Sequence, residues 1–133
     1  MKTIKVNIVT PDGPVNASEA DMVIASTETG EIGILPGHIA MVAPLQIGAL
    51  RLKKDNTTTN IAIHGGFIEV RPDVVTVLAQ HAELASDIDL ARAERAAKRA
   101  EQELQAKTDK LDAQLVQLDL KRAINRINVH KMK

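Results

Sequence analysis

Residues 72–105 read PDVVTVLAQHAELASDIDLARAERAAKRAEQELQ, and within this stretch the chain changes character. Before His81 the apolar residues recur in short runs with a period of about two, which is typical of strands. Beyond it the period lengthens to roughly three and a half, and residues 90–105 are dense in Ala, Glu, Arg and Leu, which favour helix. All seven glycines and all five prolines lie at or before Pro72. The sequence therefore predicts two domains, an all-β sandwich followed by an α-helical hairpin.

The first predicted domain, residues 1–84, consists of short strands separated by turns. Residues 4–9 alternate apolar and polar side chains, and residues 10–14 (TPDGP) supply strong turn chemistry. Clusters of Gly, Pro, Asp, Asn and Thr at short spacing bound the later strands. These later strands are expected at 21–25, 33–35, 48–52, 60–64, 67–71 and 74–78. This rhythm indicates a β-sandwich or a flattened barrel.

The second predicted domain, residues 85–133, is helical and is the cationic half of a chain whose formal net charge is zero. Ser86 or Asp87 is the expected cap of a first helix, and a second helix is expected over about 112–129. Thr108 and Asp109 mark the turn between them. Because this connection is short, the two helices should fold back as an antiparallel hairpin.

The contact surface of the first helix is predicted to be mostly alanine. It comprises Ala93, Ala96, Ala97 and Ala100, with Leu104 near the end. The second helix carries Leu111, Leu115 and Leu118 on one stripe, with Val116, Leu120, Ala123 and Ile127 beside it. Alanine buries little area, so the hairpin should pack weakly, while each helix is long enough to persist alone. We expect a tail that can extend.

Composition excludes several kinds of site. The chain has no cysteine, and its four histidines show no metal-ligand spacing, so no metal site is expected. Phe67 is the single aromatic residue, which leaves no platform for stacking bases, so nucleic acid is not an expected partner. No apolar run approaches the roughly 20 residues that cross a bilayer, so direct membrane insertion is not expected. No nucleophile and base form a recognisable motif, so a binding or regulatory module is favoured over an enzyme.

Three motifs in the first domain are specific to one family. They read GEIGILPGH (residues 30–38), GGFIEV (65–70) and VTVLA (75–79). Together with the strand rhythm and the two-helix tail, they resemble the epsilon subunit of bacterial F-type ATP synthase along the whole chain. Ala40 and Met41 depart from the Pro and Leu that are common there, which affects the expected stiffness of that loop. The resemblance implies a non-catalytic subunit of the central stalk.

The resemblance also implies partners and a location. The sandwich would contact the gamma subunit and the ring of c subunits, with Glu31 and His38 in the loop that touches the ring. In an extended state the tail would reach the catalytic alpha and beta subunits and inhibit ATP hydrolysis. The protein would be peripheral, at the cytoplasmic face of the bacterial cell membrane. Taken without its motif, a loop histidine such as His38 is usually only a solvent-exposed residue.

A second motif lies in the tail. Ile88-Asp89-Leu90-Ala91-Arg92-Ala93 resembles the Ile/Leu-Asp-x-x-Arg-Ala motif of those epsilon subunits that bind ATP, as in thermophilic bacilli. The motif implies ATP as a regulatory ligand, without clearly requiring magnesium. Asp89 would accept from the amine of adenine, Ile88 would pack on the ring, and Ala93 would leave room for it. No P-loop is present, so hydrolysis at this site is not expected.

Basic residues complete the expected ATP site. Arg92 would reach ribose or phosphate, and Arg122 and Arg126, spaced i and i+4, would meet the start of the first helix. Glu83 matches a family position near the nucleotide. Charge spacing by itself favours surface salt bridges of about 0–1 kcal/mol and makes Asp89 only a helix-start residue. The alternative is therefore a purely structural rotor subunit whose tail does not sense ATP.

Overall fold

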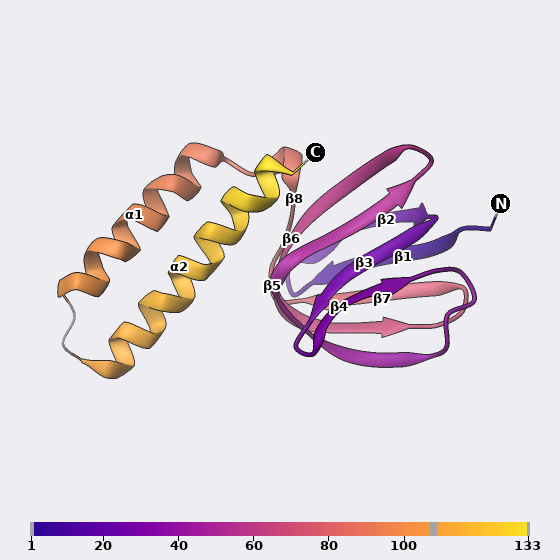
Figure 1. Ribbon diagram of the computed structural model, residues 1–133, viewed down its shortest axis with the longest axis horizontal. Coiled ribbons are helices and arrows are strands. Elements are labelled where there is room, and N and C mark those ends of the chain that lie inside the picture. The colour runs from indigo at the N-terminus through magenta and orange to yellow at the C-terminus, as the bar shows by residue number, and fades with distance from the viewer. Residues whose placement is uncertain (1, 107–108, 133) are drawn as a thin grey trace.

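The computed structural model describes residues 2–106 and 109–132, which form a β-sandwich and a helical hairpin (Figure 1). The strands are β1 (Ile4–Thr10), β2 (Gly13–Ala20), β3 (Met22–Thr27), β4 (Gly30–Ile34), β5 (Met41–Lys54), β6 (Thr57–Val70), β7 (Val74–Ala79) and β8 (Ala82–Leu84). A short 3-10 helix, η1 (Ala85–Asp87), leads to α1 (Leu90–Ala106) and α2 (Lys110–Lys131). The predicted fold class is confirmed.

The sandwich is one continuous sheet in the order β2-β1-β7-β6-β5-β3-β4, with β8 paired to β6. β1 and β7 run parallel, and the other pairs are antiparallel. β5 and β6, each 14 residues long, pair from Met41 opposite Val70 to Lys54 opposite Thr57. Side chains from both ends of the strand order meet in one aliphatic core that includes Ile8, Ile34 and Ile68.

The strand predictions differ from the structure mainly in β6. Residues 60–64 and 67–71 were expected as two strands, but one strand runs through Gly65 and Gly66, which have φ of +84° and +120°. A Cβ on Gly66 would lie 2.1 Å from the carbonyl oxygen of Leu78 on β7. The two glycines therefore allow a close crossing inside a strand instead of making a turn. The sequence also missed β2 and β8, and β5 is much longer than expected.

Asp89, and not the predicted Ser86 or Asp87, caps the first helix. The backbone N–H of Arg92 donates to Asp89 Oδ1 at 3.1 Å. Ser86 and Asp87 belong to η1, and Ile88 after them has an extended backbone. The first α-helix can therefore begin only after Ile88. Asp109 caps α2 by accepting from the N–H of Leu111 at 2.8 Å. Thr108, expected in the turn, lies outside the described residues.

The hairpin packs through small side chains, as predicted. Ala93, Ala97 and Ala100 are buried on α1, opposite Val116 and Ala123 on α2. The stripe of Leu111 and Leu115 faces solvent instead, with 65% and 57% exposure. Over the described residues, neither helix combines the length and the apolar content needed to cross a membrane.

The hairpin stands to one side of the sandwich, and the C-terminal end of α2 lies against it (Figure 1). Ile88, Val129 on α2 and Ala62 on β6 form a small buried apolar cluster, which we call the docking cluster. The side-chain amide of Asn125 donates to the carbonyl oxygen of Gly48 on β5 at 2.9 Å. These contacts leave a space between the helices and the sheet.

Candidate functional site

A cavity of about 560 Å³ lies between the hairpin and the sandwich. Its volume is within the roughly 300–1,000 Å³ of small-molecule sites. β6 and β8 contribute His64 and Glu83, α1 contributes Arg92 and Ala93, and α2 contributes Arg126. Because its walls come from both domains, a ligand bound here would contact the hairpin and the sandwich at once.

Asp89 lies at the N-terminus of α1 and lines this cavity. Its Oδ1 accepts the capping hydrogen bond, while its Oδ2 has no hydrogen bond within the described part of the chain. The side chain is exposed, so the remaining oxygen is an acceptor available to an amine of a ligand.

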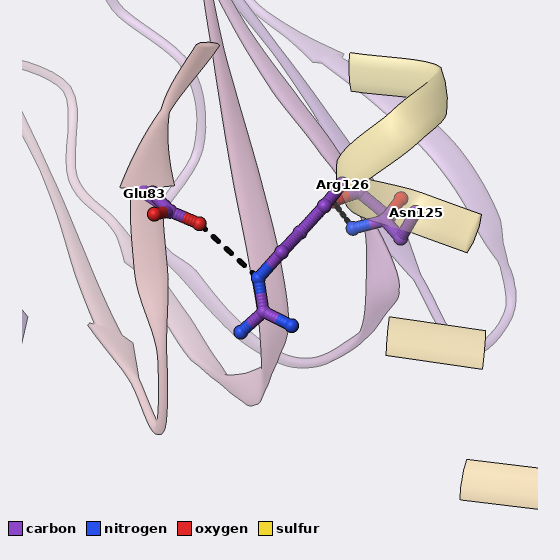
Figure 2. A network of polar contacts seen from close by, with 4 residues as sticks. Glu83, Asn125 and Arg126 are labelled. Carbon is purple, nitrogen blue, oxygen red and sulfur yellow. Dashed lines mark hydrogen bonds and ion pairs between the residues drawn. The ribbon is translucent and has the colours of Figure 1, made fainter. Parts of the chain in front are cut away.

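Glu83 and Arg126 are joined across the cavity. Arg126 Nε donates to Glu83 Oε1 at 3.1 Å, and both side chains are about one-third exposed, at 34% and 38%. Figure 2 shows the two terminal nitrogens of the guanidinium pointing away from Glu83. Glu83 therefore holds Arg126 through its Nε, and the two terminal nitrogens of the guanidinium remain able to donate to an anion.

Two of the predicted ATP-binding residues do not line this cavity. Ile88 is 5% exposed and belongs to the docking cluster. Arg122 lines a neighbouring cavity of about 340 Å³ that shares His81, Arg99 and Arg126 with the first. The cavity thus brings together five of the predicted residues, namely Glu83, Asp89, Arg92, Ala93 and Arg126. Arg122 lies beside them, and Ile88 lies beneath the hairpin.

The two residues predicted to touch the ring lie elsewhere, and neither lines the cavity. Glu31 on β4 pairs with Arg51 on β5 at 3.3 Å, and its side chain is 59% exposed. His38 follows β4, with its Nδ1 2.7 Å from the carbonyl oxygen of Ile39.

His64 is a cavity residue that the sequence did not indicate. It is 2% exposed, and burial, together with the charges of Arg126, Arg122 and His81, lowers its pKa from 6.5 to about 4. A single histidine in a strand gives no signal, because only the pairing of β6 with β8 brings it to this cavity. Arg99 on α1 also lines the cavity, although the sequence did not place it in the site.

Comparison with known proteins identifies the family. The family profile described as the ATP synthase delta/epsilon chain beta-sandwich domain matches residues 3–85, and that of the long alpha-helix domain matches residues 86–131. The ATP synthase epsilon chain of Bacillus cytotoxicus is 58% identical over 133 residues, which is 100% of both chains. That of Bacillus velezensis is 57% identical over 129 residues, covering 97% of this chain and 98% of the relative.

Solved structures support the same fold. A chain in the Euglena gracilis mitochondrial ATP synthase structure of OSCP, F1 and c-ring matches with a TM-score of 0.81 and 22% identity, over 92% of this chain and 78% of that one. A chain in the Tetrahymena thermophila structure of central stalk and c-ring matches with a TM-score of 0.58. With both domains matched and with full-length relatives above half identity, this chain belongs to the ATP synthase delta/epsilon chain family, as an epsilon chain.

Proposed function

We propose that this epsilon chain is a regulatory subunit of the central stalk whose tail is held closed by ATP. The observation that carries the proposal is the cavity between the domains, where an acceptor at Asp89 faces Arg92 and Arg126. The amine of adenine fits the free oxygen of Asp89, and the phosphate chain fits the guanidinium groups. ATP would therefore bridge α1, α2 and the sandwich.

The energetics suit a ligand-controlled hairpin. The docking cluster buries two aliphatic side chains of moderate size, Ile88 and Val129, each contributing about 1.5–3 kcal/mol. The bond from Asn125 adds about 0.5–1.5 kcal/mol, and the half-exposed Glu83–Arg126 pair adds at most about 1 kcal/mol. A ligand at 100 times its dissociation constant adds about 2.7 kcal/mol. Bound ATP thus adds about as much as one buried aliphatic side chain of the docking cluster.

The wider role follows the relatives, which are named ATP synthase epsilon chains, and the neighbours, which are solved with the c-ring. The sandwich would contact the gamma subunit and the c-ring, with Glu31 and His38 at the ring. Without ATP the undocked tail would extend to the catalytic alpha and beta subunits and inhibit hydrolysis. Its basic side chains would then pair with acidic surfaces there. The chain itself catalyses no reaction in this proposal, and it lies peripherally at the cytoplasmic face of the membrane.

One observation favours the alternative of a structural subunit that does not sense ATP. The Glu83–Arg126 pair and the Asn125–Gly48 bond join α2 to the sandwich through groups of the protein itself. In that alternative these contacts alone hold the tail, and only partner subunits release it.

Calorimetric titration with ATP separates the two functions. The variant Asp89→Asn keeps a capping oxygen but loses the charge, and Arg92→Gln removes a cavity guanidinium. We expect one ATP per chain in the native protein and at least tenfold weaker binding in the double variant. Arg95→Gln, on the exposed side of the same helix, is the matched control and should bind normally. Absence of binding at millimolar ATP would leave the structural alternative.

A further inference from the structure

His64 occupies the floor of the cavity because of the alternation of β6. Ile61 and Ile63 point into the sandwich core, so Ala62 and His64 point to the opposite face, beneath the hairpin. The backbone N–H of His64 donates to the carbonyl oxygen of His81 at 3.0 Å. This bond fixes the strand but does not involve the ring.

Both ring nitrogens of His64 are buried, and neither has a hydrogen-bond partner within the described residues. The same holds for Nε of Arg122 on α2. Buried polar atoms are almost always paired, so unpaired ones at the edge of a cavity point to a missing ligand. His64 lines the cavity between the domains, and Arg122 lines the neighbouring one.

The charges around His64 come from several elements. The cations are Arg92 and Arg99 on α1, Arg122 and Arg126 on α2, and His81 before β8 when protonated. The acids are Asp12, Glu83, Asp87 and Asp89 of the same cavity, and Glu103 and Asp119 of the neighbouring one. The charges that act on the ring are nevertheless those of Arg126, Arg122 and His81, and with burial they lower its pKa to about 4. At neutral pH the ring is therefore an uncharged imidazole surrounded by positive charge.

We propose that His64 contacts the phosphate chain of the nucleotide and takes up one proton from solvent when the nucleotide binds, an inference that rests on the proposed function. A phosphate chain between the arginines and the ring reverses the sign of the field at His64. The proton enters on an unpaired ring nitrogen, which then donates to a phosphate oxygen. No covalent bond changes.

Proton uptake makes ATP affinity depend on pH. In the free chain His64 gains a proton only near pH 4, whereas in the complex it gains one at higher pH. Between these two values binding carries a proton with it, so affinity rises as pH falls, by up to about tenfold per pH unit for one proton. Above the bound-state pKa the dependence disappears.

Calorimetry in two buffers of different ionisation enthalpy tests the proposal. At about pH 6 to 6.5 the native chain should bind ATP with net proton uptake exceeding that of His64→Gln by roughly half a proton or more. The terminal phosphate of ATP also titrates in this range, and the variant subtracts that contribution because it binds the same nucleotide. His38→Gln, which does not line the cavity, is the matched control and should retain the uptake. Equal uptake by His64→Gln and the native chain would overturn the proposal.

A second measurement uses the unaltered chain and so does not depend on the folding of a variant. The NMR titration of the His64 ring should move upward by about two pH units or more with saturating ATP. Tripolyphosphate should shift it likewise, whereas adenosine should not, because the contact is to phosphate. An unshifted titration with ATP bound would overturn the role of His64 and leave the proposed function standing. Absence of ATP binding would overturn both.

Discussion

Asp89 serves both the fold and the candidate ligand with one carboxylate. Its Oδ1 caps α1, and its Oδ2 faces the cavity without a hydrogen bond inside the described chain. Replacement by alanine would remove about 1 kcal/mol of capping as well as any ligand contact, so lost binding would be ambiguous. Asparagine keeps the cap and separates the two effects.

The low pKa of His64 predicts a loss of stability in acid without ATP. The folded chain holds His64 neutral to about pH 4, while the unfolded chain protonates it near pH 6.5. Below pH 6.5 the unfolded state binds more protons than the folded state, so the free energy of unfolding falls as pH decreases. The loss reaches about 3 kcal/mol at pH 4. Urea unfolding at pH 7 and at about pH 4.5 measures this loss.

Two histidine variants identify the source of the acid effect. His64→Gln cannot protonate and should show a flatter profile between these pH values. His38→Gln should keep the native profile, since His38 does not line the cavity. An equal acid loss in His64→Gln and the native chain would assign the effect to other groups.

The candidate site was predictable where a local motif, a matched family position or helical spacing marks a residue, as for Asp89, Glu83 and Arg126. Asp89, Arg92 and Ala93 lie within six residues, and they do line one cavity. His64 carries no such signal, because strand pairing and helix docking, both long-range, bring it there. Ile88 also belongs to the motif. Its backbone is extended just before the cap of α1, and its side chain lies in the docking cluster.

At the scale of elements, helices were easier to predict than strands. The helical period continues without Gly or Pro, so the α1 prediction missed only its start. In β6 the pair Gly65-Gly66 was interpreted as a break, although positive φ there permits a close crossing with β7. β2 was missed because its side chains are mostly exposed and give no alternating pattern. The sequence indicates which conformation a segment prefers locally. Whether β2 forms and whether β6 continues through its glycines depends on the strands that pair with them.

The docking of α2 should depend on Val129, which is fully buried beneath the hairpin. Val129→Ala removes two methyl groups from the docking cluster and should weaken docking by about 2 kcal/mol, with both helices retained. Hydrogen exchange of the Ile88 amide region and circular dichroism measure docking and helix content.

The matched control on the same helix is Leu115→Ala. Leu115 is 57% exposed, so its loss should leave docking unchanged. A comparable increase in exchange from both variants would show that docking does not depend on the cluster.

The whole molecule has two apolar regions of very different size. Every residue of the sandwich core lies at or before residue 84, whereas the docking cluster has three buried members. The hairpin projects from one side of the sandwich (Figure 1). The sandwich therefore has the contacts to fold alone, and the hairpin is an attachment to it.

Deletion of residues 88–133 should consequently leave a folded sandwich. Thermal unfolding should stay cooperative, with a modest loss of stability because Ala62 and His64 become exposed. In the assembled ATP synthase the truncated chain should still incorporate but no longer inhibit ATP hydrolysis, measured as ATPase rate. Persistent inhibition would contradict the extended-tail mechanism, and failed assembly would contradict the independence of the sandwich.

The attachment of α2 at one end makes the hairpin a lever. Its polar and apolar contacts to the sandwich involve Asn125, Arg126 and Val129, all in the last two turns of a helix about 33 Å long. A neighbouring subunit that pushes sideways on the far end of the hairpin acts at a long distance from the anchor. The docking contacts resist the push over a much shorter distance. A force on the tip is therefore multiplied at the anchor, so a push on the far end loads the few contacts there most strongly.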